Sequence, residues 1–285
     1  MDAPARQANP ALREPVERMP APFTEPHQTR GQQAWPAAAS FLYRLSLTVF
    51  TFHLAAPGHL AVLRSLLRPP TRETVAGLRH AECMFPMRLG ASILSPGRWQ
   101  VGRLAVFAAW EGEAAVDDFL ANTDLGRTLL AGWHVRLRFL RRWGHVGALD
   151  WLPREEGETD LDAPVAAVTL ARLSLPQVLR FIHWGKPVER LVRDHPGTTL
   201  ALAATRPFRT ISTFTVWHSA REMLDMVHGR GQVPEPGRHA AAMIERSRKD
   251  FHREFATLRF GVISEAGVWE GRTSIVPITP SAAKG

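Results

Sequence analysis

The sequence predicts an α+β protein built from two tandem β-α-β-β-α-β units that pack together as one α/β barrel. Three observations predict this class. The segment Phe107-Ala-Ala-Trp110 returns 107 residues later as Phe214-Thr-Val-Trp217. Each copy ends a strand pattern and is followed by an amphipathic helix pattern. An acidic, proline-bounded stretch separates two halves of similar length. Because such a unit leaves one sheet face uncovered, two copies in one chain would cover each other without oligomerisation.

In the first half, alternating apolar residues predict strands, and apolar residues three or four positions apart predict helices. The expected elements are a strand over 45–54, a helix over 58–67, strands over 84–93 and 101–110, a helix over 113–122 and a strand over 133–139. The two middle strands are expected to pair around the turn Ser95-Pro96-Gly97.

The second half repeats this order. The expected elements are a strand over 165–173, a helix that starts at Pro176 and breaks near Pro187, strands over 198–205 and 210–217, a helix over 219–227 and a strand over 255–263. The helix at 219 opens with the capping box Ser219-Ala-Arg-Glu222. One further helix, over 239–251, has no counterpart in the first half. Apart from this insertion, both halves have the ferredoxin-like order of elements.

Composition shifts mark the boundaries between these units. Seven of the 22 prolines lie in the first 38 residues, so 1–40 is expected to be a disordered, proline-rich tail. The first repeat is expected to cover 41–152, an acidic linker 153–164, and the second repeat, which carries the candidate site, 165–271. Residues 272–285 are expected to form a flexible C-terminal tail.

Charge and composition exclude several classes of protein. The 285 residues have a formal net charge of +8, but the arginines are scattered and form no nucleic-acid module, so no nucleic acid is expected as a partner. Cys83 is the one cysteine; it excludes an internal disulfide and is expected to pack as a small apolar residue rather than to ligate heme.

The sequence also bears on location. The longest apolar stretch, 41–56, is interrupted by Arg44 and His53 and is too short to span a bilayer. No export signal opens the chain. We therefore expect a cytoplasmic protein, with peripheral contact at the inner face of the membrane left open.

Few residues remain as candidates for chemistry. The sequence contains no His-x-x-x-His pair, no dinucleotide or Walker-type phosphate loop and no Gly-x-Ser-x-Gly elbow. His239 is the strongest candidate metal ligand. It opens the helix Gly237-Arg-His-Ala-Ala-Ala-Met-Ile244, where the positive end of the helix dipole favours neutral imidazole. Met243 shares its face, and the three alanines would admit a flat macrocycle; the alternative is an exposed or capping histidine.

Other candidates are less specific. Arg206 and Arg209 flank the turn between the strands at 198–205 and 210–217, where they could bind carboxylates such as heme propionates or simply be solvated. His183 and His218 are expected to be ordinary core or surface histidines. The aromatic residues Trp184, Phe214 and Trp217 are expected in the core, with a pocket wall as the alternative.

Several of these segments resemble the spheroidene monooxygenase family of carotenoid biosynthesis, within the dimeric α/β-barrel superfamily. The resemblance covers about residues 45–265 and is clearest in the second half. It rests on Val165-Ala-Ala-Val-Thr-Leu-Ala-Arg-Leu173 with the helix at Pro176, on Phe214-Thr-Val-Trp217 and on Arg238-His-Ala-Ala-Ala-Met-Ile244, and in the first half on Thr48-Val-Phe-Thr-Phe52 and Ala105-Val-Phe-Ala-Ala-Trp110. The proline-rich tail, the loop over 229–237 and the acidic linker fall outside it.

The resemblance implies a heme-dependent monooxygenase. It implies heme b as cofactor, a hydrophobic, carotenoid-like substrate and a ferredoxin-type electron donor. Heme proteins with related two-repeat barrels bind iron through a histidine on a second-repeat helix, which implies His239 as the iron ligand. Two other classes stay open from the residues alone. One is a cofactor-free oxygenase or small-ligand-binding barrel protein, and the other is a non-catalytic association module.

Overall fold

The computed structural model describes residues 48–230 and 252–277, apart from six side chains between 173 and 182. The start of the first expected strand and the whole of the expected N-terminal tail lie outside these ranges. So do the expected helix over 239–251 and the last eight residues. The tail, repeat and linker boundaries therefore stay predictions.

Seven of the described elements precede the acidic stretch. In chain order they are β1 (Val49–Ala55), α2 (His59–Leu67), β2 (Leu78–Met87), β3 (Leu104–Trp110), α3 (Glu113–Asn122), α4 (Asp124–Leu130) and β4 (Trp133–His145). Short 3₁₀ turns, η2 (Pro96–Arg98) and η3 (Gly147–Leu149), lie before β3 and after β4.

The remaining elements follow the acidic stretch. They are β5 (Val165–Leu173), the 3₁₀ turn η4 (Leu175–Gln177), α5 (Val178–Asp194), β6 (Thr198–Arg206), β7 (Thr210–Trp217), α6 (Ala220–Val227) and β8 (His252–Gly267). The chain is thus of mixed α and β structure with eight antiparallel strands, which confirms the predicted class of secondary structure. None of the helices in the described ranges is both long and apolar enough to span a bilayer.

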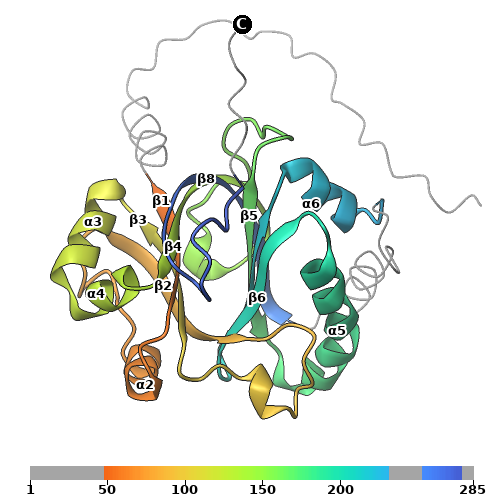
Figure 1. Cartoon of the computed structure of the whole chain (residues 1–285), viewed down its shortest axis with the longest axis horizontal. Helices are drawn as coiled ribbons and strands as arrows, with labels where there is room; N and C mark the ends of the chain where they lie inside the picture. Colours follow the sequence, from red (N-terminus) through yellow and green to blue (C-terminus); the bar gives the residue numbers. More distant parts are fainter. Residues whose placement is uncertain (1–47, 231–251, 278–285) are drawn as a thin grey trace, which may run out of the picture.

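The strand pairings form a closed ring in the order β1-β3-β2-β6-β7-β5-β8-β4 (Figure 1). Strands β2, β3, β1 and β4 are consecutive in this ring, and so are β6, β7, β5 and β8. The two groups pair with each other at two places, the β4–β8 seam and the β2–β6 seam. Twelve residue pairs join β4 to β8, whereas only three join β2 to β6.

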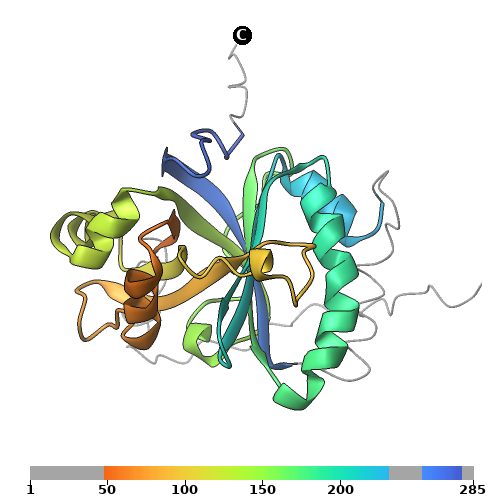
Figure 2. The ribbon, with the colours of Figure 1, turned by 60° about the horizontal axis from the view of Figure 1, so that its bottom comes forward.

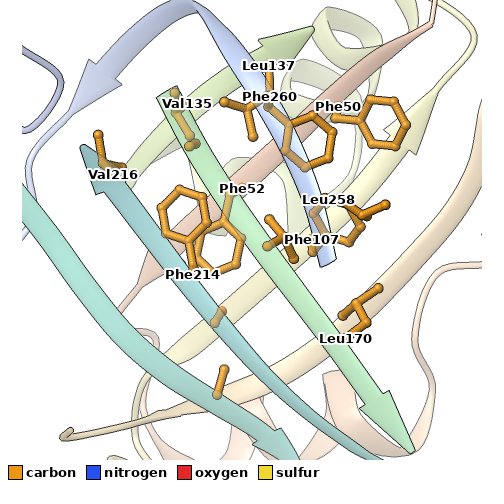
Figure 3. Close-up of a cluster of buried hydrophobic side chains, with 14 of the residues drawn as sticks. Phe50, Phe52, Phe107, Val135, Leu137, Leu170, Phe214, Val216, Leu258 and Phe260 are labelled. Carbon is orange, nitrogen blue, oxygen red and sulfur yellow. The ribbon is translucent and has the colours of Figure 1, made fainter. Parts of the chain in front are cut away.

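The ring is filled by large apolar side chains (Figure 3). Phe52 of β1 and Phe214 of β7 stack with their ring centroids 3.8 Å apart. Phe50 of β1 packs against Phe260 of β8 at 4.9 Å. These contacts join strands of both halves, so the interior is one shared hydrophobic core. A ligand site must therefore be sought outside the ring.

We expect Phe214→Leu to lower the free energy of unfolding by about 1–2 kcal/mol, because the substitution removes a stacked aromatic contact and leaves a small void. Urea unfolding measures the change. Phe208→Leu is the matched control: Phe208 is exposed in the β6–β7 turn, so its replacement should stay within about 0.5 kcal/mol. Equal losses in both variants would contradict the packing described.

Helices cover the ring unequally (Figures 1 and 2). In the first half α2, α3 and α4 pack on the outer sheet face. Their buried residues join outward side chains such as Phe85, Val106 and Trp110 in a second core. In the second half α5 runs beside β6, and α6 follows β7. Among the described side chains, the core beneath α5 and α6 centres on Trp217, Met223 and Met226.

The structure differs from the expected elements in three ways that have a physical cause. Strand β2 covers Leu78–Met87 rather than 84–93, because its inward residues His80 and Glu82 form polar contacts that interrupt the apolar pattern. It pairs with β3 as expected, but the predicted tight turn at 95–97 was wrong, since a longer connection that contains η2 joins the two strands. Helix α5 continues through Pro187 instead of breaking there, so the proline only removes one hydrogen bond of a 17-residue helix.

The third difference is helix α4, which the sequence pattern did not predict. Thr123 caps it by accepting a hydrogen bond from the Gly126 N–H at 2.9 Å. A Cβ at Gly126 would lie 1.9 Å from the Phe119 carbonyl oxygen, so the close turn between α3 and α4 requires glycine.

The segments outside the regular elements also make contacts with the ring. In the acidic stretch, Glu156 N–H donates to the Leu140 carbonyl at 2.8 Å, which ties this stretch to β4. After β8, Ile275 is buried, and its N–H donates to the Glu265 carboxylate at 2.7 Å. Residues 272–277, the first part of the expected C-terminal tail, thus pack against one end of the barrel.

Candidate functional site

The expected iron ligand His239 and its neighbour Met243 lie in residues 231–251, outside the described ranges, so both stay predictions. The expected propionate partners lie at the β6–β7 turn. Arg206 is half-buried at the end of β6, and Arg209 is exposed. Within residues 48–230 and 252–277 neither guanidinium forms an ion pair, which leaves both able to bind an anion.

The outer face of the second-half sheet carries an ordered set of small side chains. Strand register aligns the outward residues of β6, β7, β5 and β8 in three rows. In that strand order the rows are Thr205–Ile211–Ala171–Phe255, Ala203–Thr213–Thr169–Thr257 and Ala201–Thr215–Ala167–Arg259. We call the nine alanines and threonines of these rows the alanine–threonine platform. Four strands and three rows make a surface of about 14 by 13 Å.

The platform is less covered than the corresponding face of the first half. Five of the nine platform residues, Thr213 in the middle row among them, are half-buried, and so is Ile211 beside them. The other four, Ala171, Ala203, Thr205 and Thr215, are buried. Val106 and Leu104 of β3, which lie 107 residues before Thr213 and Ile211, are fully buried beneath the first-half helices. The two halves share their order of elements, but the outward residues of β7 are more exposed than the corresponding residues of β3.

Several threonine hydroxyls of the platform form hydrogen bonds with other groups of the protein. The Thr169 and Thr257 hydroxyl oxygens lie 3.2 Å apart, across β5 and β8. Thr205 donates to the Thr210 carbonyl at 2.9 Å, and Thr215 accepts from the Trp217 indole N–H at 2.8 Å. These hydroxyls do not need a polar ligand, so the platform suits an apolar, flat molecule.

Arg259 ends the third row and carries a buried positive charge. It is 6% exposed, its Nε has no hydrogen-bond partner among the described residues, and its guanidinium lies 4.8 Å from the ring centre of Trp143. Burial lowers the pKa of Arg259 and nearby Arg141 lowers it further, while the negative charge of Glu155 opposes this shift. Within the described ranges no carboxylate forms an ion pair with it. A ligand carboxylate at this end of the platform would meet an unpaired cation.

Cys83 behaves as the sequence predicts. It is fully buried on the outer face of the first half, among apolar side chains. Burial, and the negative charge of Glu82, raise the pKa of its thiol to about 12. The thiol therefore stays protonated, which disfavours any role as a metal ligand.

A polar cluster at one end of the barrel was missed by the sequence analysis. Glu82 of β2 accepts hydrogen bonds from Arg172 of β5 and from the Thr210 hydroxyl of β7, the latter at 3.1 Å. His80 Nε2 lies 3.4 Å from the same carboxylate. Although burial raises its pKa, the close contact with His80 and the hydrogen bond and charge of Arg172 lower the pKa of Glu82 to about 2.

This cluster joins strands of both halves near the short β2–β6 seam, where few backbone pairs connect them. The charged carboxylate is satisfied on several sides, which is typical of a structural ion pair. Two signals in the sequence could have found it: the spacing His80-Ala-Glu82, and Arg172 within the otherwise apolar strand β5.

A second missed feature is a pair of buried histidines. His53 of β1 and His134 of β4 face each other in register, with ring centroids 5.3 Å apart. His53 is fully buried, and neither of its ring nitrogens has a hydrogen-bond partner among the described residues. Burial lowers the pKa of His53 to about 3, aided by His134 and Arg136. No third His, Cys, Asp or Glu of the described ranges completes a metal site here.

The chain is similar in sequence to two curated proteins. No family model matches the chain. It is 29% identical over 173 residues to the spheroidene monooxygenase of Rubrivivax gelatinosus, which covers 60% of this chain and 64% of the relative. It is 22% identical over 197 residues to that of Cereibacter sphaeroides, which covers 67% of this chain and 58% of the relative.

The chain thus spans about three fifths of the length of the curated relatives it matches. Among solved structures, an aldoxime dehydratase in complex with butyraldoxime matches with a TM-score of 0.45 and 9% identity, covering 77% of this chain and 81% of that one. The resemblance to spheroidene monooxygenase noted from short segments is confirmed as a similarity to two curated proteins of that name.

Proposed function

We propose that the protein is an oxidoreductase, a heme-dependent monooxygenase of a hydrophobic, carotenoid-like substrate. The similarity to two spheroidene monooxygenases supports the reaction class. The observation that supports a flat cofactor is the alanine–threonine platform, a half-covered sheet face of small side chains. In the first half, large side chains and three helices fill the corresponding surface.

Heme b fits this face of the chain by shape and by charge. We propose His239, in the segment that joins α6 to β8, as the iron ligand, with Met243 beside the macrocycle. When bound, heme would supply the activation of dioxygen. The protein residues would hold it against the platform, keep the ligating imidazole neutral and exclude water from the substrate.

Arginines border the platform at two ends and are the proposed partners of the heme propionates. Arg206 and Arg209 lie by the turn next to the first row, and Arg259 ends the third row. Arginine suits this task because its guanidinium binds both oxygens of a carboxylate. Arg259 is also buried, and its charge has no ion-pair partner among the described residues. A propionate would supply that partner.

The relatives' name suggests the remaining partners. A carotenoid-like substrate dissolves in the bilayer, so peripheral contact with a membrane is part of the proposal. A ferredoxin-type protein is the proposed electron donor. The two halves are proposed to be copies of one β-α-β-β-α-β unit that form an α/β barrel within one chain. Their shared element order and the 107-residue offset of Phe107 and Phe214 support this.

The proposal is tested by the absorption spectrum of the full chain expressed with heme supply. We expect a Soret band in the wild-type protein and, in His239→Ala, a shifted Soret band with about tenfold weaker heme retention, because the iron loses its ligand. His218→Ala is the matched control, since His218 is exposed at the start of α6 and should leave the spectrum unchanged.

Three outcomes would contradict parts of this proposal. An unchanged Soret band in His239→Ala would remove His239 as the ligand. A wild-type chain without heme that still consumes oxygen with a carotenoid substrate would be a cofactor-free oxygenase. Ligand binding without oxygen consumption would instead indicate a small-ligand-binding protein.

A further inference from the structure

Helix α2 has two apolar faces. Val62 and Ser65 are buried against the outer face of the first-half sheet. Leu60, Leu63 and Leu67 lie on the opposite side of the helix and are 72%, 52% and 70% exposed. A cluster of exposed leucines on one face of a helix is typical of a surface that contacts a partner. The leucine face of α2 is therefore expected to have a partner.

The loop over 88–103 runs from the start of α2 to α5, where the Gly90 N–H donates to Glu189, and it carries further exposed apolar residues. It meets the start of α2 where Gly58 N–H donates to the Gly102 carbonyl at 3.1 Å. Leu94 is 92% exposed, and Trp99 and Val101 are also exposed. Figures 1 and 2 place α2 and this loop on the same side of the barrel, at the lower edge in Figure 1 and toward the viewer in Figure 2. We call the leucine face and the exposed residues of this loop the leucine surface.

Basic residues outnumber acidic ones around the leucine surface, where Glu189 and Glu270 pair with Arg98 and Arg103 of the loop. Residues 56–72 and 88–103 contain no aspartate or glutamate. Arg64, Arg68 and Arg88 are exposed, and none of them forms an ion pair within the part of the chain that the structure describes. An apolar centre with an unpaired basic border is complementary to an anionic lipid bilayer, whose headgroups attract arginine while leucine and tryptophan enter the interface.

We propose that the leucine surface docks the protein on anionic membranes. The unpaired arginines favour this partner over a second copy of the chain, because two identical surfaces would bring like charges together. This inference assigns the proposed membrane contact to a particular surface. It rests on the proposed function only in one respect, that docking would give access to a substrate dissolved in the membrane.

The test is sedimentation of the full chain with vesicles, which needs neither heme nor substrate. We expect binding to vesicles of phosphatidylcholine with phosphatidylglycerol and at least tenfold weaker binding to pure phosphatidylcholine. Leu60→Gln/Leu67→Gln should weaken binding to the anionic vesicles at least tenfold. Arg64→Gln/Arg68→Gln should reduce the preference for anionic lipid. Leu130→Gln/Leu161→Gln, which changes exposed leucines of α4 and the acidic stretch, is the matched control and should bind like wild type.

Circular dichroism and gel filtration accompany each variant, so that misfolding is recognised. No binding by the wild-type chain would overturn the proposal. Equal binding by the Leu60/Leu67 variant would overturn it as well. A wild-type dimer that the same variant converts to a monomer would show that the surface joins two copies instead. None of these results bears on heme binding, so the oxygenase proposal stands or fails separately.

Discussion

A His53→Leu variant is expected to remove much of the acid sensitivity of the fold. In the folded chain the His53 imidazole has a pKa of about 3, because it is fully buried beside His134 and Arg136. In the unfolded chain the pKa is about 6.5. Between these values only the unfolded chain takes up the proton, so stability is fully present above about pH 6.5 and falls toward pH 3. The loss from this one group reaches about 5 kcal/mol.

Urea unfolding at pH 7 and pH 4.5 measures this effect. We expect the wild-type protein to lose about 2–3 kcal/mol more than His53→Leu between these two values. Carboxylates such as Glu82 lose their own contributions in acid, but they do so in both proteins. His218→Leu, at an exposed site, should keep the wild-type pH dependence. A parallel decline of wild type and His53→Leu would show that His53 is not buried as a neutral group.

Filling the platform is expected to remove heme binding while keeping the fold. Thr213 lies in the middle row, half-buried, between Ala203 of β6 and Thr169 of β5. In Thr213→Trp the indole would occupy the surface that the macrocycle needs. We expect about a hundredfold weaker hemin affinity, of the order of the cost of overpacking a filled site. Hemin titration followed by absorption measures it.

Two controls make this result specific. Thr213→Val keeps the volume of the side chain and should bind hemin like wild type. Ile263→Trp places the same indole at an exposed position of β8 outside the three rows and should also leave binding unchanged. Unaltered affinity in Thr213→Trp would mean that heme, if it binds, does so away from the platform.

The sequence predicted the elements best where the pattern is purely apolar. Strands β5 and β7 have the expected bounds, and Ser219 caps α6 as its capping box indicates. Strand β2 was placed too late because His80 and Glu82 point into the barrel, where they contact residues of distant strands. No local pattern reveals such partners, since Glu82 and Thr210 are 128 residues apart.

In the candidate site, too, the sequence indicated residues with a local signal but not those that strand pairing brings together. Arg206 and Arg209 were found because they flank a recognisable turn. The platform was not found, because its alanines and threonines are ordinary strand residues one at a time. They become a surface only when the register of four strands aligns Ala203, Thr213, Thr169 and Thr257 in one row. Comparison of the halves then distinguishes it, since Val106 is buried where Thr213 is half-covered.

Titration of the purified wild-type chain with hemin tests the central claim most directly. If heme binds on the second-half platform, the Soret absorbance should saturate at one hemin per chain, and Thr213→Trp should approach saturation only at about a hundredfold higher hemin concentration. Absorbance that rises without saturation, or that saturates equally in wild type and Thr213→Trp, would contradict a heme site on the alanine–threonine platform.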